Sequence, residues 1–272
     1  MADHRETRPY YYKLERQRFA CITYAVTAVF LILALLQWYL FHLLGATNKY
    51  FTSNYWVGII FFVLSLVLIM LFIFFEDLRF FTPINWILAF IIFECVVVGV
   101  TSLVVRHYQY HLLVSFLIWT VVLVIFLVLG SFIPRDLTLD IVVLVILGII
   151  CIIGAMYFLM LYLVANVPYS FFVYRAFIVF SIVTFIMYHA QIINGGRFAE
   201  IRDKDYLLAA LILFYDFLLM YLFTFQLAPK WSDVCDTHRN STNIFVVDQH
   251  LKRTTAQAKM VIADAIQVDV EA

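Results

Sequence analysis

Long apolar runs separated by short polar connections restrict what this sequence can fold into. A helix that spans the hydrocarbon core of a bilayer needs about 20 apolar residues. The runs are too long for the strands of a membrane barrel, which need about 10 residues, and they do not alternate in polarity. We therefore expect an all-α integral membrane protein with seven transmembrane helices in one bundle. The seven runs cover residues 19–44, 56–75, 84–105, 112–133, 137–165, 171–193 and 206–227.

Composition supports a membrane protein and argues against several other classes. Only 13% of the 272 residues are charged, against about 25% in a soluble domain. The formal net charge is zero, so no overall field attracts nucleic acid. No motif for nucleotide binding, zinc binding or nucleophilic catalysis is present, so we expect neither an enzyme nor a cofactor. Membrane lipids are the expected surroundings.

The sequence predicts three parts: a cytoplasmic N-terminal segment over residues 1–18, a transmembrane domain over 19–229, and a soluble tail over 230–272. The orientation follows from Lys and Arg, which gather in cytoplasmic connections. With a cytoplasmic N-terminus, ten basic residues face the cytoplasm and three face the opposite side. The ten are Arg5, Arg8, Lys13, Arg16, Arg18, Arg79, Arg135, Arg197, Arg202 and Lys204, and the three are Lys49, Arg106 and Arg175.

Seven crossings would place the tail in the lumen or outside the cell. Asn240 begins the triplet Asn-Ser-Thr, a glycosylation acceptor sequence that would be modified on that side. Such triplets also arise by chance, and the sequence leaves both interpretations open.

Asp216 and His189 are ionisable residues inside the last two apolar runs, in which Arg175 lies close to an end. Asp216 lies about ten residues from either end of the run 206–227, which is roughly 15 Å deep. An ionised carboxylate there costs about 3 kcal/mol, so it must be paired, hydrated or protonated. His189 lies near the end of the run 171–193, and histidine is the side chain that titrates nearest to neutral pH. The short connection between the runs favours a contact between them.

The alternatives for these residues are structural. Asp216 could form a single hydrogen bond between helices, and His189 could be an interfacial histidine bonded to a carbonyl. Arg79 precedes the run 84–105 and fits an ordinary cytoplasmic anchor, although its long side chain can reach inward. Glu94 lies within that same run, where it could line a polar path or stay protonated and bond to a neighbouring helix.

A resemblance emerges from the region around these residues. The segment "YHAQIINGGRFAEIRDKDYLLAALILFYDFLLMYLFTF" resembles the signature of the transmembrane Bax inhibitor motif family, most closely its lifeguard branch. The matching residues are Tyr188, Gln191, Gly195, Gly196, Asp205, Tyr206, Ala210, Leu211 and Asp216. The segment "RFFTPINWILA" resembles the family's loop before the third helix and aligns Arg79 and Asn85. The length and the short connections agree over nearly the whole chain.

The resemblance implies a pH-sensitive calcium leak channel of internal membranes that supports calcium homeostasis and restrains apoptosis. It implies the endoplasmic reticulum or Golgi, with the plasma membrane as a further location. In that family two intramembrane aspartates share a proton, and an arginine bonds them in the closed state. Asp216 matches the second aspartate and Arg79 the arginine, whereas His189 replaces the first aspartate.

This replacement changes the expected chemistry. Calcium prefers several carboxylate oxygens, so a histidine and one aspartate form a poorer site than two aspartates. We expect weaker calcium conduction than in members with both aspartates, or none, with calcium as the permeant ion and Asp216 as at most a transient contact. The alternative is a non-conducting membrane regulator of cell death that acts through apoptosis-regulating membrane proteins.

Overall fold

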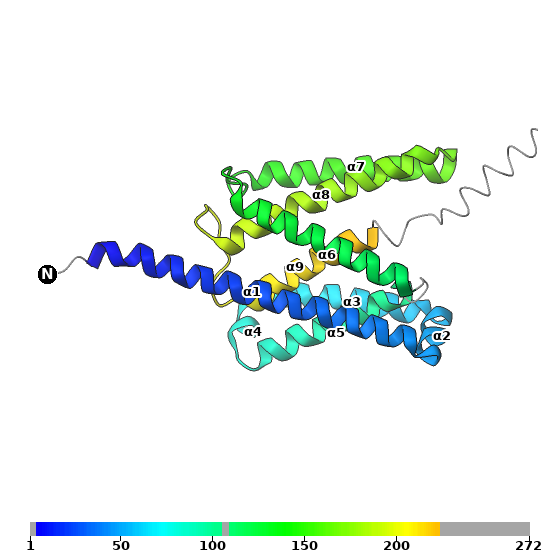
Figure 1. Cartoon of the computed structure of the whole chain (residues 1–272), viewed down its shortest axis with the longest axis horizontal. Coiled ribbons are helices and arrows are strands. Elements are labelled where there is room, and N and C mark those ends of the chain that lie inside the picture. Colours follow the sequence, from blue (N-terminus) through cyan, green and yellow to red (C-terminus); the bar gives the residue numbers. More distant parts are fainter. Residues whose placement is uncertain (1–3, 105–108, 224–272) are drawn as a thin grey trace, which may run out of the picture. The chain divides into compact units, whose positions relative to one another are not determined.

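The computed structural model describes residues 4–104 and 109–223, and every structural statement below concerns these residues. They form helices joined by short connections, with no strand in the described ranges. The helices are α1 (His4–Leu43), α2 (Gly45–Ser53), α3 (Tyr55–Phe74), α4 (Glu76–Phe80), α5 (Ile84–Val104), α6 (Gln109–Phe132), α7 (Ile141–Ala165), α8 (Pro168–Asn194) and α9 (Tyr206–Tyr221) (Figure 1). The predicted all-α class is confirmed for this part of the chain.

Six of the described helices are long and apolar enough to cross a bilayer, as expected for a multi-pass membrane protein. The seventh expected span corresponds to α9, which is apolar but has 16 residues. A helix of that length covers about 24 Å, which is less than the roughly 30 Å of a hydrocarbon core. The count of seven is therefore not confirmed, and the seventh crossing stays a prediction.

Two connections differ from the expectation of simple loops. The short helices α2 and α4 form in stretches that the sequence analysis left outside the apolar runs. Helix α1 also runs without a break from His4, so residues 4–18 continue the first long helix. Arg16 and Phe19 on this helix are both buried, which shows that packing against the bundle begins before the apolar run does.

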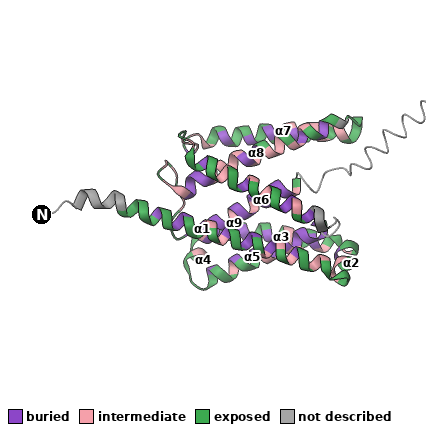
Figure 2. Cartoon of the chain, in the orientation of Figure 1, coloured by how far each residue is buried: buried purple, intermediate pink, exposed green. Residues whose placement is uncertain are grey.

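Helix α9 occupies the centre of the arrangement. It packs against α1, α5, α6 and α8, while α3 packs on α5 and α7 packs on α8 (Figure 1). Most of α9 is buried, whereas α7 exposes much of its surface (Figure 2). Aromatic rings fill the space around α9, as in the contacts of Phe214 with Phe93 and of Phe217 with Phe116. A residue in the middle of α9 is therefore shielded by several helices.

Glycine residues allow α3 and α5 to pack closely together. A Cβ atom on Gly99 of α5 would lie 2.7 Å from the backbone nitrogen of Phe62 on α3. A Cβ atom on Gly58 of α3 would lie 2.3 Å from the hydroxyl oxygen of Ser102. Because the helices lack these atoms, their backbones can approach closely, and van der Waals contact is the main attraction between helices in lipid.

Candidate functional site

His189 and Asp216, which come from the last two apolar runs, contact each other directly. His189 Nδ1 of α8 lies 2.6 Å from Asp216 Oδ2 of α9. The two side chains are 17% and 9% exposed. A separation this short is typical of a hydrogen bond in which at least one group is charged. The predicted meeting of these residues is present in the structure, and we call it the His189–Asp216 pair.

The chain between α8 and α9 brings the pair together. Helix α8 ends at Asn194, and Gly195 follows with φ +73° and ψ −169°, a backbone conformation that is essentially restricted to glycine. The Ile201 amide donates to the Ile192 carbonyl, which turns the chain back along α8. Helix α9 then begins after Asp205 and runs antiparallel to α8. We call residues 195–205 the α8–α9 connection.

The surroundings of Asp216 along α9 are apolar. Leu213 and Met220, one turn before and after it, are fully buried, as is Phe217. An ionised carboxylate in such a place is costly unless a partner compensates its charge. The imidazole of His189 is the partner that the described residues supply. The arrangement is therefore a polar contact between two helices that is surrounded along α9 by apolar side chains.

Arg79 does not join this pair, contrary to the expectation from the family resemblance. Its Nη1 donates to Asp205 Oδ2 at 3.1 Å, and the two side chains are only 11% and 4% exposed. Asp205 lies eleven residues before Asp216, which is about 16 Å along a helix. Arg79 on α4 therefore holds the start of α9, and its predicted bond to the membrane carboxylate is wrong for this structure.

Arg16 is a site residue that sequence reasoning missed. Its guanidinium donates to Asp203 at 2.9 Å, to the Ile201 carbonyl at 2.5 Å and to the Ile192 carbonyl. A Cβ atom on Gly195 would lie 2.5 Å from Arg16 Nε, so only glycine leaves room for this side chain. The acceptors lie 176 to 187 residues from Arg16 in the sequence, and no local sequence pattern predicts contacts over such a separation.

Further polar contacts fix the α8–α9 connection. Arg202 forms two hydrogen bonds with Glu76 of α4, at 2.8 and 3.0 Å. The Tyr12 hydroxyl donates to Glu200 at 2.5 Å. The Phe198 amide donates to Asp136 at 3.1 Å. The connection is thus held by α1, by α4 and by the turn between α6 and α7.

The carboxyl groups of this region respond differently to their surroundings. Burial raises the pKa of Asp205, and the opposing effect of Arg79 and Arg202 does not cancel it. The hydrogen bond from Arg202 lowers the pKa of Glu76. The hydrogen bond from the Thr138 hydroxyl lowers the pKa of Asp136.

Glu94 has its own partner. Gln37 Nε2 of α1 donates to Glu94 Oε1 of α5 at 2.7 Å, and both side chains are half-buried. This contact matches the predicted alternative of a bond to a neighbouring helix. Its place in a polar path for ions stays a prediction.

The remaining site predictions are not tested by the geometry. Among the described residues, no three His, Cys, Asp or Glu side chains lie close enough to hold a metal ion together. The transient calcium contact at Asp216 stays a prediction. Asn240 and the tail over residues 230–272 lie outside the described residues.

Comparisons with family models, with curated proteins and with solved structures found no match to this chain.

Proposed function

We propose that this chain is a pH-sensitive calcium leak channel of an internal membrane, with the His189–Asp216 pair as its proton sensor. The observation that carries the proposal is the 2.6 Å contact between His189 and Asp216 in an otherwise apolar helix packing. An ionisable pair inside a spanning bundle is costly and marks a functional position by default. The proposal includes a cytoplasmic N-terminus and a seventh crossing by α9.

Protonation would act on the contact between α8 and α9. With a protonated imidazole, the pair is an ion pair of zero net charge, and its charge-assisted hydrogen bond holds the helices together. When the imidazole loses its positive charge, its Nδ1–H can still donate to the carboxylate, but the pair then carries one net negative charge among apolar side chains, which favours entry of water and cations. The leak should therefore be small in acid and should rise as pH increases.

The size of the effect follows from the strength of the bond. A hydrogen bond to a charged group contributes about 1.5 to 3 kcal/mol. Each 1.4 kcal/mol changes an equilibrium about tenfold. If deprotonation weakens the bond by about 1.4 kcal/mol or more, the open population should change by about tenfold or more.

The test is calcium flux into proteoliposomes between pH 6 and pH 8, for the wild type, Asp216→Asn and the control Asp140→Asn. Asp140 is 41% exposed and pairs with Arg135 in the turn before α7. We expect the wild type and Asp140→Asn to leak more at pH 8, and Asp216→Asn to lose this dependence. An Asp216→Asn variant with the wild-type pH profile would refute the proton-sensing role.

A second candidate is a non-conducting membrane regulator of cell death. The observation that favours it is the apolar packing around Asp216, where Leu213, Phe217 and Met220 are fully buried. The same flux assay separates the candidates. A wild-type chain that passes no calcium at any pH would support the regulator, with partners among apoptosis-regulating membrane proteins.

A further inference from the structure

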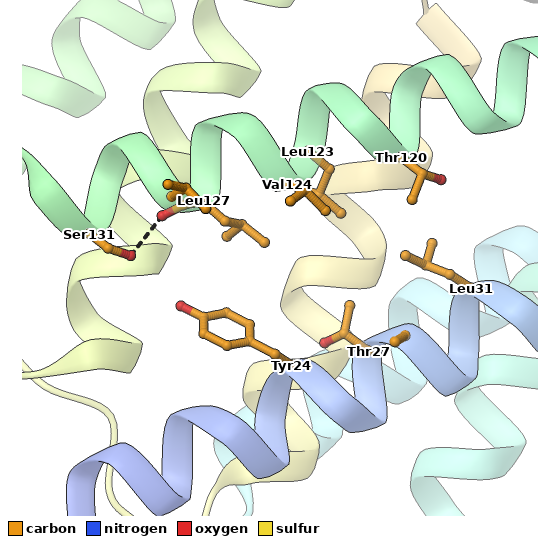
Figure 3. A pocket seen from close by; sticks show the side chains of 10 residues that line it. Tyr24, Thr27, Leu31, Thr120, Leu123, Val124, Leu127 and Ser131 are labelled. Atoms are coloured by element: carbon orange, nitrogen blue, oxygen red, sulfur yellow. Dashed lines mark hydrogen bonds between the residues drawn. The ribbon is translucent and has the colours of Figure 1, made fainter.

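A narrow apolar groove lies between α1 and α6. Its volume is about 270 Å³. Figure 3 shows the side chains of α1 and α6 facing one another across it. The lining residues are Tyr24, Thr27, Ala28, Leu31, Thr120, Leu123, Val124, Leu127, Val128 and Ser131. Ala28 and Val124 are exposed while Leu31 and Leu123 are buried, so the groove has a buried floor and an open side. We call it the α1–α6 groove.

Four hydroxyl groups line the groove, of which that of Tyr24 is buried without a hydrogen-bond partner among the described residues. Thr27, Thr120 and Ser131 each donate to the carbonyl four residues earlier in their own helix, and Figure 3 shows the bond of Ser131. Their hydroxyl protons are therefore satisfied within the helix. The groove suits a hydrocarbon chain.

A wider space of about 1250 Å³ adjoins one end of the groove, and its largely apolar lining includes charged and polar side chains. Tyr24 and Ser131 line both spaces, so the two lie next to each other at these side chains. The wider space is also bordered by Lys13, Gln17 and Gly196. The surface of α1 along the two spaces thus carries charged and polar side chains around Lys13 and Gln17 and aliphatic ones around Leu31.

We infer that this surface binds one phospholipid, with an acyl chain in the α1–α6 groove and the phosphate at Lys13 and Gln17. The distance along α1 fits such a molecule. From Gln17 to Leu31 the helix rises about 21 Å, and one leaflet with its headgroups is about 20 to 22 Å thick.

The volume argues against a helix from a partner protein. A helix is at least about 10 Å across, so a 15 Å length of it fills roughly 1200 Å³. The groove holds about 270 Å³, which is far too small for a helix and suits a single chain of methylene groups.

The charges at the wide end favour a phosphate. Lys13 is exposed and forms no ion pair within the described residues, so its ammonium group can meet an anion. Arg16 is already engaged with Asp203 and two backbone carbonyls. Lys13 is therefore the cation that a headgroup would contact. This inference stands whether or not the chain conducts calcium.

The experiment is native mass spectrometry of the full chain in detergent, titrated with dioleoyl phosphatidylglycerol and, in parallel, dioleoyl phosphatidylcholine. Val124→Trp fills the groove, and Val121→Trp is its control. Both valines lie on α6 with similar exposure, 52% and 57%, but only Val124 lines the groove. Lys13→Gln is compared with Lys49→Gln, which removes the same charge from exposed α2.

We expect one tightly bound phospholipid per wild-type chain. Val124→Trp should bind it at least tenfold more weakly, and Val121→Trp should bind it normally. Lys13→Gln should weaken phosphatidylglycerol binding several-fold, and Lys49→Gln should not. Equal binding by Val124→Trp and Val121→Trp would overturn the acyl site, and equal binding by the two lysine variants would overturn the phosphate contact.

A second readout does not depend on a variant that folds poorly. Cys21 is exposed and lines the wide end, so a maleimide can label it in a Cys235→Ser background. Bound phosphatidylglycerol should slow this labelling several-fold in an otherwise wild-type chain. A labelling rate unchanged by saturating lipid would contradict the inference.

Discussion

His189 contributes an imidazole to its pair with Asp216. An aspartate at the same position would contribute a second carboxylate and change the net charge of the pair. The contact between His189 and Asp216 is short and mostly buried. With one carboxylate, the pair reaches zero net charge when the histidine is protonated. Two carboxylates instead resist joint ionisation and share a proton. The identity of this one residue should therefore control how well the site attracts a divalent cation.

Replacement of His189 tests this effect. His189→Asp adds a carboxylate, the ligand type that calcium prefers, so calcium leak at pH 8 should rise several-fold over the wild type. His189→Gln adds no carboxylate and should give no such gain. The measurement is calcium flux into proteoliposomes at matched protein density. A wild-type leak equal to or larger than that of His189→Asp would refute the prediction.

Gly195 is the second residue whose identity the structure restricts. Its backbone conformation suits only glycine, and an added Cβ would lie 2.5 Å from Arg16 Nε. Gly195→Ala should therefore lower the free energy of unfolding by about 1 to 3 kcal/mol. Gly45→Ala is the control, because a Cβ there meets nothing within 4 Å. Equal melting temperatures of the two variants in detergent would contradict the account.

At the scale of elements, the α8–α9 connection joins helices that are distant in sequence. Arg16 of α1 and Arg79 of α4 both hold it, through Asp203 and Asp205 respectively. Because the connection determines where α9 begins, these contacts position Asp216 indirectly.

Loss of Arg79 should destabilise the connection without removing the proton sensor. Arg79→Gln leaves Asp205 buried without its cation, and breaking a buried pair costs about 3 to 5 kcal/mol. Arg135→Gln breaks a pair of side chains that are 74% and 41% exposed and should cost at most about 1 kcal/mol. Melting temperatures test the stability, and calcium flux tests the pH profile. A flat pH profile in a folded Arg79→Gln variant would show that Arg79 belongs to the sensor.

The carboxyl groups of the connection predict its own pH response. Folding lowers the pKa of Glu76 and of Asp136, so their stabilisation is present above an unfolded pKa of about 4 and is lost as pH falls through the lower folded value. Burial acts to raise the pKa of Glu200, but hydrogen bonds from Tyr12 and Gly196 lower it overall. Glu200 therefore also stabilises the fold above its unfolded pKa and loses this effect as pH falls. Asp205 has a raised pKa, so its contribution to the free energy of unfolding becomes more favourable as pH falls.

Hydrogen exchange of the amides over residues 196–205 measures this response. After correction for intrinsic rates, protection should stay constant from pH 8 to about pH 5 and fall below about pH 4. Loss of protection between pH 8 and pH 6 would contradict this prediction, because the connection itself would then respond to pH near neutrality.

At the scale of the whole molecule, the apolar runs predicted seven spanning helices, and six long apolar helices are present in the described residues, because each of those six runs reaches the length of a bilayer crossing. They did not predict α2 or α4, since short helices in polar connections depend on tertiary contacts. Residues 206–227 are so uniformly apolar that the sequence does not predict the end of the α-helix of α9 at Tyr221. Contacts between residues distant in the sequence also explain which parts of the site could not be predicted. The short connection predicted that His189 meets Asp216, but the partner of Arg79 and the burial of Arg16 depend on chain segments more than 120 residues away.

The central claim is that His189 and Asp216 act as one switch, and a double-mutant cycle tests it most directly. The measurement is the ratio of calcium flux at pH 8 to that at pH 6 for the wild type, His189→Gln, Asp216→Asn and the double variant. If the two residues form one unit, either single substitution removes the pH dependence, and the double variant matches the single variants. Independent, additive effects of the two substitutions on this ratio would contradict the account.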